Sequence, residues 1–282
     1  MNKTIYISDL DGTLLNSQRQ VSKSSVQLIN ELIEEKNVHF SVATARTPAT
    51  VEYLLKEIKV QEPIIVMNGV ALYDLTKHEY SQVEYFGERL AKEIISHLGD
   101  WIKHGFIYTI HNHRITAHYD QLIGKGRINF YEERKNLEYK KFTNDSITNY
   151  NEIIYFVFID TKENIQAIYD LLESIEGIGM VRYKDIYCNE SYLLEVYTTK
   201  ATKANGVEKL KSKGQFTNVI CFGDQLNDLN MFHEADEAYA VGNAAKEIKK
   251  VATAVIGTND EDSVARFIYE HACHKDKEEE KC

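Results

Sequence analysis

The sequence has few cysteines, and none of them is arranged as a metal or disulfide motif. The four cysteines lie far apart and form no Cys-X-X-Cys pair, so neither a zinc knuckle nor a disulfide framework is suggested. The chain also has no run of 18 apolar residues and no N-terminal pattern of a signal peptide. We therefore expect no membrane span and no secretion, which indicates a soluble, cytoplasmic protein.

The sequence also lacks an excess of basic residues. Its 33 lysines and arginines are outnumbered by 43 aspartates and glutamates, which gives a formal net charge of −10. Because no surplus of positive charge can replace the counterions of a polyanion, we expect no nonspecific binding to nucleic acid or to an anionic membrane. This total is compatible with a small basic pocket for a phosphorylated metabolite. The expected assembly is a monomer or a homodimer.

Several catalytic motifs are absent as well. The chain has no Walker A loop, no Gly-X-Gly-X-X-Gly fingerprint, no His-Glu-X-X-His pair and no Gly-X-Ser-X-Gly elbow. Kinase-like, dinucleotide-binding, zinc-protease and serine-hydrolase functions are therefore disfavoured. There is also no internal repeat of the kind that builds a solenoid or a propeller.

The first third of the chain alternates short apolar runs with segments whose apolar residues recur at helical spacing. This order of strands and helices indicates parallel pairing with right-handed crossovers, and therefore an α/β domain with a Rossmann-like parallel sheet. The same alternation returns near the C-terminus. The expected strands of the first third are 4–9, 38–44 and 62–69, and the expected helices are 22–37 and 48–58.

The middle of the sequence has a different pattern. Residues 84–192 combine two expected helices with hairpin-like aromatic strands such as FIYTIHNHRITAHY. We interpret this segment as a separate α+β domain inserted into a split core domain. The core would consist of residues 1–83 and 193–282, joined to the insert by linkers near 80–86 and 188–196.

Polar side chains follow the expected strands of the split core. Asp9 and Asp11 come at the end of the first strand, and Thr44 lies at the end of the second. Asn68 lies at the end of the third strand, and Asp224 follows the later apolar run VICF. In an open parallel sheet these positions gather at one edge, where ligands bind. The sequence therefore predicts one site built from residues that are far apart in the chain.

The segment DLDGTLL brings two carboxylates together. Residues two apart on an extended segment point the same way, so Asp9 and Asp11 would face one spot. Two like charges at that separation need a proton or a cation between them. Gly12 lets the backbone turn sharply after them. A carboxylate in such a place can attack phosphorus and give an acyl phosphate, which splits hydrolysis into two steps.

Four motifs together resemble those of the haloacid dehalogenase superfamily. They are DLDGTLL, ATAR, a lysine before a helix, and GDQLNDLNMF. The long insert between the second and third motifs is similar in size and position to the large α/β cap of the Cof-type phosphatases. The resemblance spans nearly the whole chain. It implies a Mg²⁺-dependent phosphatase that acts through an aspartyl-phosphate, with the insert as a lid that selects the substrate.

The resemblance assigns roles to the acidic residues. Asp9 matches the nucleophile, and Asp11 matches the general acid that protonates the leaving oxygen and later activates water. Asp9, Asp224 and the main-chain carbonyl of Asp11 match the magnesium ligands of the family, and Asp228 is placed at the same metal site. Carboxylate and carbonyl oxygens are the ligands that Mg²⁺ prefers.

The resemblance also assigns residues to the phosphate and the rest of the substrate. Lys203 is the expected phosphate lysine, with Lys200 close enough in sequence to be an alternative. The family usually has Gly where this chain has Ala204 and Ala45, and we expect little effect because both replacements are small. The residues assigned to phosphate or substrate are Gly12, Thr44, Ala45, Arg46, Asn68, Lys203 and Asn227.

Two alternative functions stay open at this point. They are a phosphomutase of the same superfamily and a non-catalytic sensor of a phosphorylated ligand. A dehalogenase is disfavoured, because such enzymes dispense with the metal and the second aspartate. The histidines of HNHRITAH are interpreted as an exposed hairpin tip and not as a metal site. Sugar phosphates, nucleotides, flavin mononucleotide and pyridoxal phosphate are all open as substrates.

Overall fold

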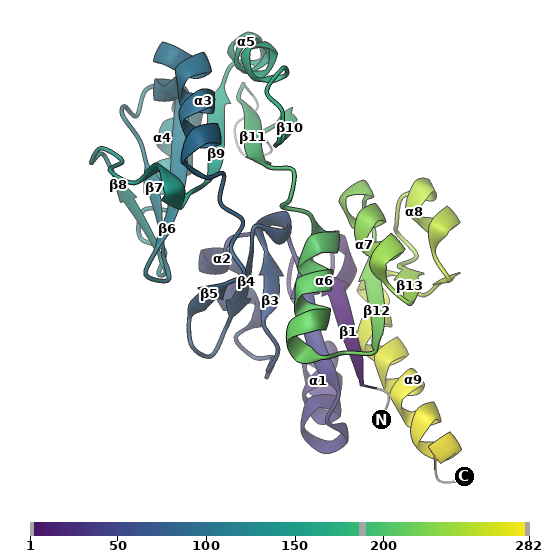
Figure 1. The fold of residues 1–282 in the computed structure, drawn as a ribbon. Helices are drawn as coiled ribbons and strands as arrows, with labels where there is room; N and C mark the ends of the chain where they lie inside the picture. The colour runs from purple at the N-terminus through teal and green to yellow at the C-terminus, as the bar shows by residue number, and fades with distance from the viewer. Residues whose placement is uncertain (1–2, 186–189, 280–282) are drawn as a thin grey trace. The chain divides into compact units, whose positions relative to one another are not determined.

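A computed structural model of the chain describes residues 3–185 and 190–279 (Figure 1). The chain divides into two compact units by its internal contacts. The first, here called the core unit, comprises Met1–Gln82 and Ala201–Cys282. The second, here called the insert unit, comprises Val83–Lys200. The predicted α/β fold with a Rossmann-like sheet and an inserted α+β segment is confirmed.

The core unit is built on one eight-stranded sheet in the order β14-β13-β12-β1-β2-β3-β4-β5. All pairs from β14 to β3 are parallel, and β4 and β5 extend the edge as an antiparallel hairpin. The strands are β1 (Thr4–Asp9), β2 (His39–Ala43), β3 (Ile64–Val66), β4 (Ala71–Asp74), β5 (Glu79–Ser81), β12 (Asn218–Gly223), β13 (Glu237–Ala240) and β14 (Ala254–Val255).

The strand order of the core unit reverses at its centre. From β1 the chain moves through α1 to β2 on one side, whereas from β12 it moves through α7 to β13 on the other. Right-handed crossovers in opposite directions put these two helices on opposite faces of the sheet, and the gap between β1 and β12 is where such sheets bind ligands. The helices are α1 (Lys23–Lys36), α2 (Pro48–Leu55), α6 (Lys203–Gly214), α7 (Leu229–Glu234), α8 (Lys246–Val251) and α9 (Ser263–Glu279).

Local sequence accounts for several helix ends. Ser22 accepts a hydrogen bond from the amide of Ser25 and caps α1, and Pro48 is the first residue of α2, where its missing N–H costs nothing. Helix α6 ends at Gly214, and the next residue, Gln215, adopts the left-handed conformation that caps it.

The insert unit contains a six-stranded, mostly antiparallel sheet in the order β10-β11-β9-β6-β7-β8. The predicted aromatic hairpin forms β6 and β7, joined at Asn112 and His113, which both have positive φ. The strands are β6 (Gly105–His111), β7 (Arg114–His118), β8 (Lys140–Thr143), β9 (Ile153–Asp160), β10 (Ile178–Lys184) and β11 (Tyr192–Thr198). The helices are α3 (Glu88–Leu98), continued by the 3-10 turn η3 (Gly99–His104), α4 (Lys125–Glu132) and α5 (Lys162–Leu172).

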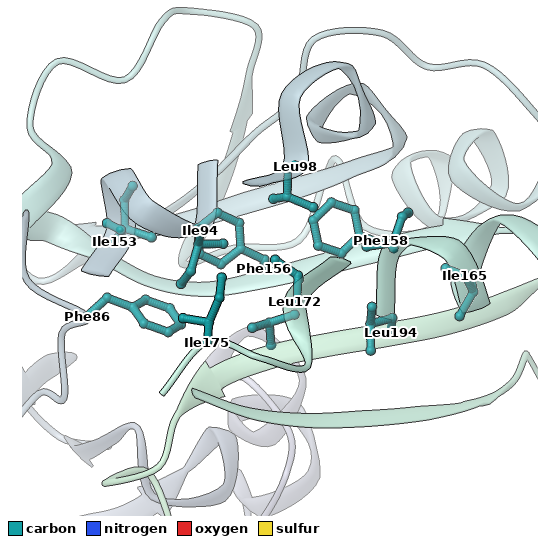
Figure 2. Packing of buried hydrophobic residues seen from close by; sticks show 13 residues of the cluster. Phe86, Ile94, Leu98, Ile153, Phe156, Phe158, Ile165, Leu172, Ile175 and Leu194 are labelled. Carbon is teal, nitrogen blue, oxygen red and sulfur yellow. The ribbon is translucent and has the colours of Figure 1, made fainter. Parts of the chain in front are cut away.

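The insert unit has a hydrophobic core of its own. Figure 2 shows Ile94 of α3 and Leu172 of α5 packing with Phe156 and Phe158 of β9. The two phenylalanines lie on the same face of the sheet because they are two residues apart, and their rings stack at a centroid distance of 6.4 Å. Burial of this apolar surface gives the insert unit an independent driving force for folding.

The structure corrects the expected second boundary of the insert. Residue 193, where we expected the core to resume, lies inside β11, which pairs with both β9 and β10. The insert unit therefore extends to Lys200. Residues 188 and 189, the first two of the expected linker at 188–196, lie outside the described residues.

Candidate active site

Two strand ends at the centre of the core sheet deliver the first acidic side chains. Asp9 is the last residue of β1, and Asp224 follows β12, with both side chains buried. After Asp9 the chain makes a tight turn in which Gly12 has φ +82°. A Cβ atom at Gly12 would lie 2.5 Å from Oδ2 of Asp224. The turn therefore needs glycine, both for its backbone conformation and for the space beside Asp224.

A buried lysine links the acidic residues. Lys203 is the first residue of α6, and its Nζ lies 2.5 Å from Oδ1 of Asp9 and 2.7 Å from Oδ1 of Asp228. The side chain of Lys203 is fully buried. Lys200 belongs to the insert unit, so the lysine that the core unit places among the acids is Lys203.

Asp228 has both of its carboxylate oxygens engaged within the core unit. Its Oδ1 accepts from Lys203, and its Oδ2 accepts from the backbone amides of Asp224 at 2.9 Å and Gln225 at 3.0 Å. These bonds fix the loop that carries Asp224. Asp228 is therefore suited to orienting the other groups, whereas Asp9 keeps one carboxylate oxygen, Oδ2, without a hydrogen-bond partner.

Burial controls the protonation of this cluster. Desolvation raises the pKa of Asp9 to about 7, with Asp228 and Asp224 acting in the same direction against the lowering effect of Lys203. Burial, followed by the charge of Asp228, raises the pKa of Asp224. Burial opposes the charge of Lys203, but the two carboxylates outweigh it and raise the pKa of the lysine. Negative charge is thus crowded here beyond what one lysine offsets.

The acidic cluster fits a hard divalent cation. Asp9, Asp224 and Asp228 can each offer a carboxylate oxygen, and these oxygens all lie within 4.8 Å of one another. Oδ2 of Asp9 is buried and has no hydrogen-bond partner. A buried carboxylate oxygen without a partner is costly, and a bound cation would satisfy it. The all-oxygen donor set is the one that Mg²⁺ prefers.

Asp11 lies apart from this acidic cluster. Its carboxylate is paired with Arg46, whose Nε and Nη2 donate to Oδ2 at 2.7 Å and Oδ1 at 2.6 Å. The Asp11 side chain is 48% exposed and that of Arg46 is 29% exposed. We expected Arg46 to face phosphate or substrate, whereas here it holds the carboxylate of Asp11 in a two-point pair. The carboxylate of Asp11 is not part of the group that could hold a metal.

The loop that follows β2 and the loop that follows β3 are joined by a hydrogen bond. The backbone amide of Asn68 donates to the carbonyl of Thr44 at 2.9 Å, and Oγ1 of Thr44 accepts from the amide of Arg46 at 3.1 Å. The side chain of Asn227 lies 3.4 Å from that of Asn68. Ala45 lies exposed in the loop after Thr44. The structure thus brings all of the predicted strand-end residues to one edge of the core sheet.

Three residues that we did not single out also contact the site. Gln225 donates from Nε2 to Oδ2 of Asp224 at 3.0 Å, and Thr13 donates to Oδ1 of Asp224 at 3.4 Å. Asn243 donates from Nδ2 to the carbonyl of Gly12 at 2.7 Å. Asn243 follows β13, so the rule that polar residues after parallel strands gather at one edge would have found it.

Two histidines of the aromatic hairpin have hydrogen-bond partners within the insert unit. His111 pairs with Glu152, and His118 contacts Thr109 and the carbonyl of Asp145. Among the described residues, these histidines form no group that could hold a metal.

Over the same part of the chain, no helix is long and apolar enough to cross a membrane.

Comparison with known proteins identifies the family. A model of the haloacid dehalogenase-like hydrolases matches residues 6–268. The chain belongs to this family. The predicted haloacid dehalogenase membership is therefore confirmed, and the protein is a hydrolase.

Curated relatives of this haloacid dehalogenase-like hydrolase are named phosphatases. The chain is 28% identical over 262 residues to the 5-amino-6-(5-phospho-D-ribitylamino)uracil phosphatase YcsE of Bacillus subtilis, and the match covers 92% of both chains. It is 24% identical over 280 residues to the pyridoxal phosphate phosphatase YbhA of Escherichia coli, covering 96% of this chain and 99% of the relative. A solved haloacid dehalogenase-like hydrolase from Bacteroides thetaiotaomicron has the same fold, with a TM-score of 0.75 and 23% sequence identity. The match covers 96% of this chain and 99% of the Bacteroides chain.

Proposed function

We propose that this hydrolase is a Mg²⁺-dependent phosphatase that removes phosphate from small phosphorylated metabolites through an aspartyl-phosphate. The observation that carries the proposal is the buried cluster in which Lys203 contacts Asp9 and Asp228, while one oxygen of Asp9 has no partner. The phosphatase names of the curated relatives support the same reaction. A cytoplasmic location and a monomeric or homodimeric assembly stay predictions.

The proposed reaction has two steps. In the first, a carboxylate oxygen of Asp9 attacks phosphorus, the bond from phosphorus to the leaving oxygen breaks, and Asp11 gives that oxygen a proton. In the second, Asp11 takes a proton from a water molecule, which attacks the phosphoryl group and releases phosphate and Asp9. Asp11 must leave its pair with Arg46 to carry the proton, which is feasible because this pair is solvent-exposed.

The remaining residues of the cluster have supporting roles in this proposal. Lys203 offsets charge on the transferring phosphoryl group, and Asp228 keeps the lysine and the Asp224 loop in place. Thr44 offers its hydroxyl to a phosphate oxygen. Mg²⁺ would be held by Asp9, Asp224 and the main-chain carbonyl of Asp11, and would supply positive charge against the carboxylates and the phosphate.

The names of the relatives provide the first substrates to test. They are 5-amino-6-(5-phospho-D-ribitylamino)uracil and pyridoxal phosphate, named for the Bacillus and Escherichia relatives. Identity below 30% does not transfer either substrate to this chain, so sugar phosphates, nucleotides and flavin mononucleotide belong in the same panel. Selection of the substrate by the insert unit stays a prediction.

The test is phosphate release from p-nitrophenyl phosphate and from this panel, with Mg²⁺ and with EDTA. We expect turnover that needs Mg²⁺ and is abolished in Asp9→Asn, whose fold is checked by circular dichroism. Asp11→Asn is expected to bind Mg²⁺ normally but to stall. A folded, Mg²⁺-bound protein that releases no phosphate from any ester would contradict the proposal. Activity that appears only with a bisphosphate activator would identify a phosphomutase, and ligand binding without turnover would identify a sensor.

A further inference from the structure

The insert unit contains a hollow that the proposed reaction does not use. Its volume is about 280 Å³, and it is lined by residues of α3, η3 and the start of β6, and by the segment after β8. All of its lining belongs to the insert unit. The lining residues are Ile95, Ile102, Gly105, Ile107, His118, Tyr119, Asp120, Asn144, Asp145, Ser146, Ile147 and Tyr150.

The floor of the hollow is apolar. Ile95, Ile102, Ile107 and Ile147 line it, and all four are partly buried residues packed against the hydrophobic core of the insert unit. The core is therefore open to solvent at this point. An apolar group of a ligand that covered these side chains would remove water from both surfaces, which is favourable.

The rim of the hollow is held in place by hydrogen bonds. Nδ1 of His118 lies 3.1 Å from the backbone carbonyl of Asp145, and Nε2 lies 3.0 Å from Oγ1 of Thr109. Because a carbonyl oxygen only accepts, Nδ1 carries a proton and donates it there. Oδ2 of Asp145 accepts from the hydroxyl of Thr143 at 2.7 Å. The histidine thus ties β7 to the segment that carries the Asp145 carboxylate.

The charged side chains that line the hollow are carboxylates, although Lys103, which lies outside the lining, also interacts electrostatically with Asp120. Asp120 and Asp145 are carboxylates, and the twelve described lining residues include no lysine or arginine. A carboxylate can accept up to four hydrogen bonds, so Asp145 keeps acceptor capacity after its bond to Thr143. An ammonium group would find both charge and acceptors at this rim, next to an apolar floor. The carboxylates would repel an anion, and a neutral hydrocarbon would gain only the apolar contact.

We propose that this hollow binds a small organic cation, an ammonium group attached to a ring or a branched alkyl group. The apolar part covers the four isoleucines, and the ammonium donates to Asp120 and Asp145. Both carboxylates are on exposed residues, so each contributes modestly and their attraction is weakened by salt. The proposal does not depend on the phosphatase reaction, because no residue that lines the hollow belongs to the core unit, which carries the acidic cluster.

The test uses benzylammonium and its neutral counterpart benzyl alcohol, titrated into the full chain. Trp101 is the only tryptophan of the chain and directly precedes the lining residue Ile102, so its fluorescence reports binding. We expect saturable binding of benzylammonium, weaker binding of the alcohol, and a loss of affinity at higher salt. Asp120→Asn and Asp145→Asn should each weaken binding roughly two- to fivefold, and the double variant more.

Asp170→Asn is the matched control, because Asp170 is an acid of the insert unit on α5 that does not line the hollow. It should leave the affinity unchanged. Equal affinity for the amine and the alcohol, or no effect of either rim variant, would overturn the proposal, as would no saturable signal. Running the titration also in Asp9→Asn separates this result from the phosphatase proposal, since that variant removes turnover and leaves the hollow intact.

Discussion

At the scale of single residues, the candidate site depends on one buried cation between two buried carboxylates. Lys203 is the only cationic partner that the structure gives to Asp9 and Asp228 within the described residues. Removing one partner of a buried ion pair is expensive because the other charge stays buried without compensation. The three residues should therefore not tolerate substitution equally.

The first prediction compares Lys203→Met with Asp9→Asn. Lys203→Met leaves two buried carboxylates unpaired and should lower the free energy of unfolding by about 3–5 kcal/mol. Asp9→Asn should cost less, because Lys203 keeps Asp228 and one of the crowded negative charges is removed. Urea unfolding in EDTA measures both. Equal losses in the two variants would show that the lysine is not the centre of this network.

The second prediction concerns Gly12→Ala. The added Cβ would lie 2.5 Å from Oδ2 of Asp224 and the residue keeps a φ of +82°, so Asp224 must move. We expect at least a tenfold loss of Mg²⁺ affinity, measured by calorimetric titration. Gly87→Ala is the matched control, because Gly87 also has positive φ (+75°) but no atom within 4 Å of its added Cβ. Both should pay a backbone cost of about 1 kcal/mol, and unchanged Mg²⁺ binding in Gly12→Ala would contradict the assignment.

At the scale of elements, the sequence predicts what regular periodicity and strand ends determine. The parallel strands, the aromatic hairpin and the gathering of Asp9, Thr44 and Asp224 follow from apolar patterns and from the geometry of parallel sheets. The pairing of Asp11 with Arg46 does not, because side-chain partners across a loop depend on tertiary structure. The hairpin of β4 and β5 was missed because short edge strands carry too few residues for a period to show.

Strand β8 carries a buried lysine, Lys140, which the sequence did not reveal. Among the described contacts this lysine has no carboxylate partner. Nζ of Lys140 donates to the hydroxyl of Tyr108 at 2.9 Å and lies 4.5–5.4 Å from the ring centroids of Tyr108, Phe142 and Phe130. Burial, followed by the like charge of Arg134, lowers the pKa of Lys140 to about 7. The aromatic rings compensate only part of the lost hydration.

The third prediction follows from the sign of that pKa shift. Below pH 7 both folded and unfolded chains hold the Lys140 proton, so the folded state carries the full burial cost. Between about pH 7 and the unfolded pKa of 10.5 the folded chain releases the proton first, and this cost disappears as pH rises. Lys140→Met should therefore be more stable than the parent by about 1–3 kcal/mol at pH 6, with the advantage shrinking towards pH 10.

Urea unfolding monitored by Trp101 fluorescence measures this difference within the insert unit. The matched control is Lys141→Met, since Lys141 is the next residue of β8 and is exposed. Its effect should be small and independent of pH over this range. A stability advantage of Lys140→Met that does not change with pH would contradict the depressed pKa.

At the scale of the whole molecule, the chain consists of two units with separate cores. The acidic cluster lies wholly in the core unit, and the hydrophobic cluster of Figure 2 lies wholly in the insert unit. A ligand stabilises the unit whose folded form binds it. Metal binding should therefore act on one unit and leave the stability of the other unchanged.

The fourth prediction is that Mg²⁺ separates two unfolding transitions. At Mg²⁺ about 100-fold above its Kd, the core unit should gain about 2.7 kcal/mol, which far-UV circular dichroism detects as an upward shift of part of the thermal transition. Trp101 fluorescence reports the insert unit and should show no shift. Asp224→Asn serves as the control that removes the metal effect. Equal shifts by both probes would show that the two units unfold as one.

The position of the insert in the chain also has a consequence for synthesis on the ribosome. Strand β1 lies between β2 and β12 in the finished sheet, but β12 begins at Asn218, about 209 residues after Asp9. At roughly 5–20 residues per second, β1 is made some 10–40 s before its second neighbour exists. During that time the central edge of the sheet is open to pairing with other chains. The insert unit can fold in this interval. A nascent chain would then carry one folded unit and a core sheet that still lacks the pairing between β1 and β12.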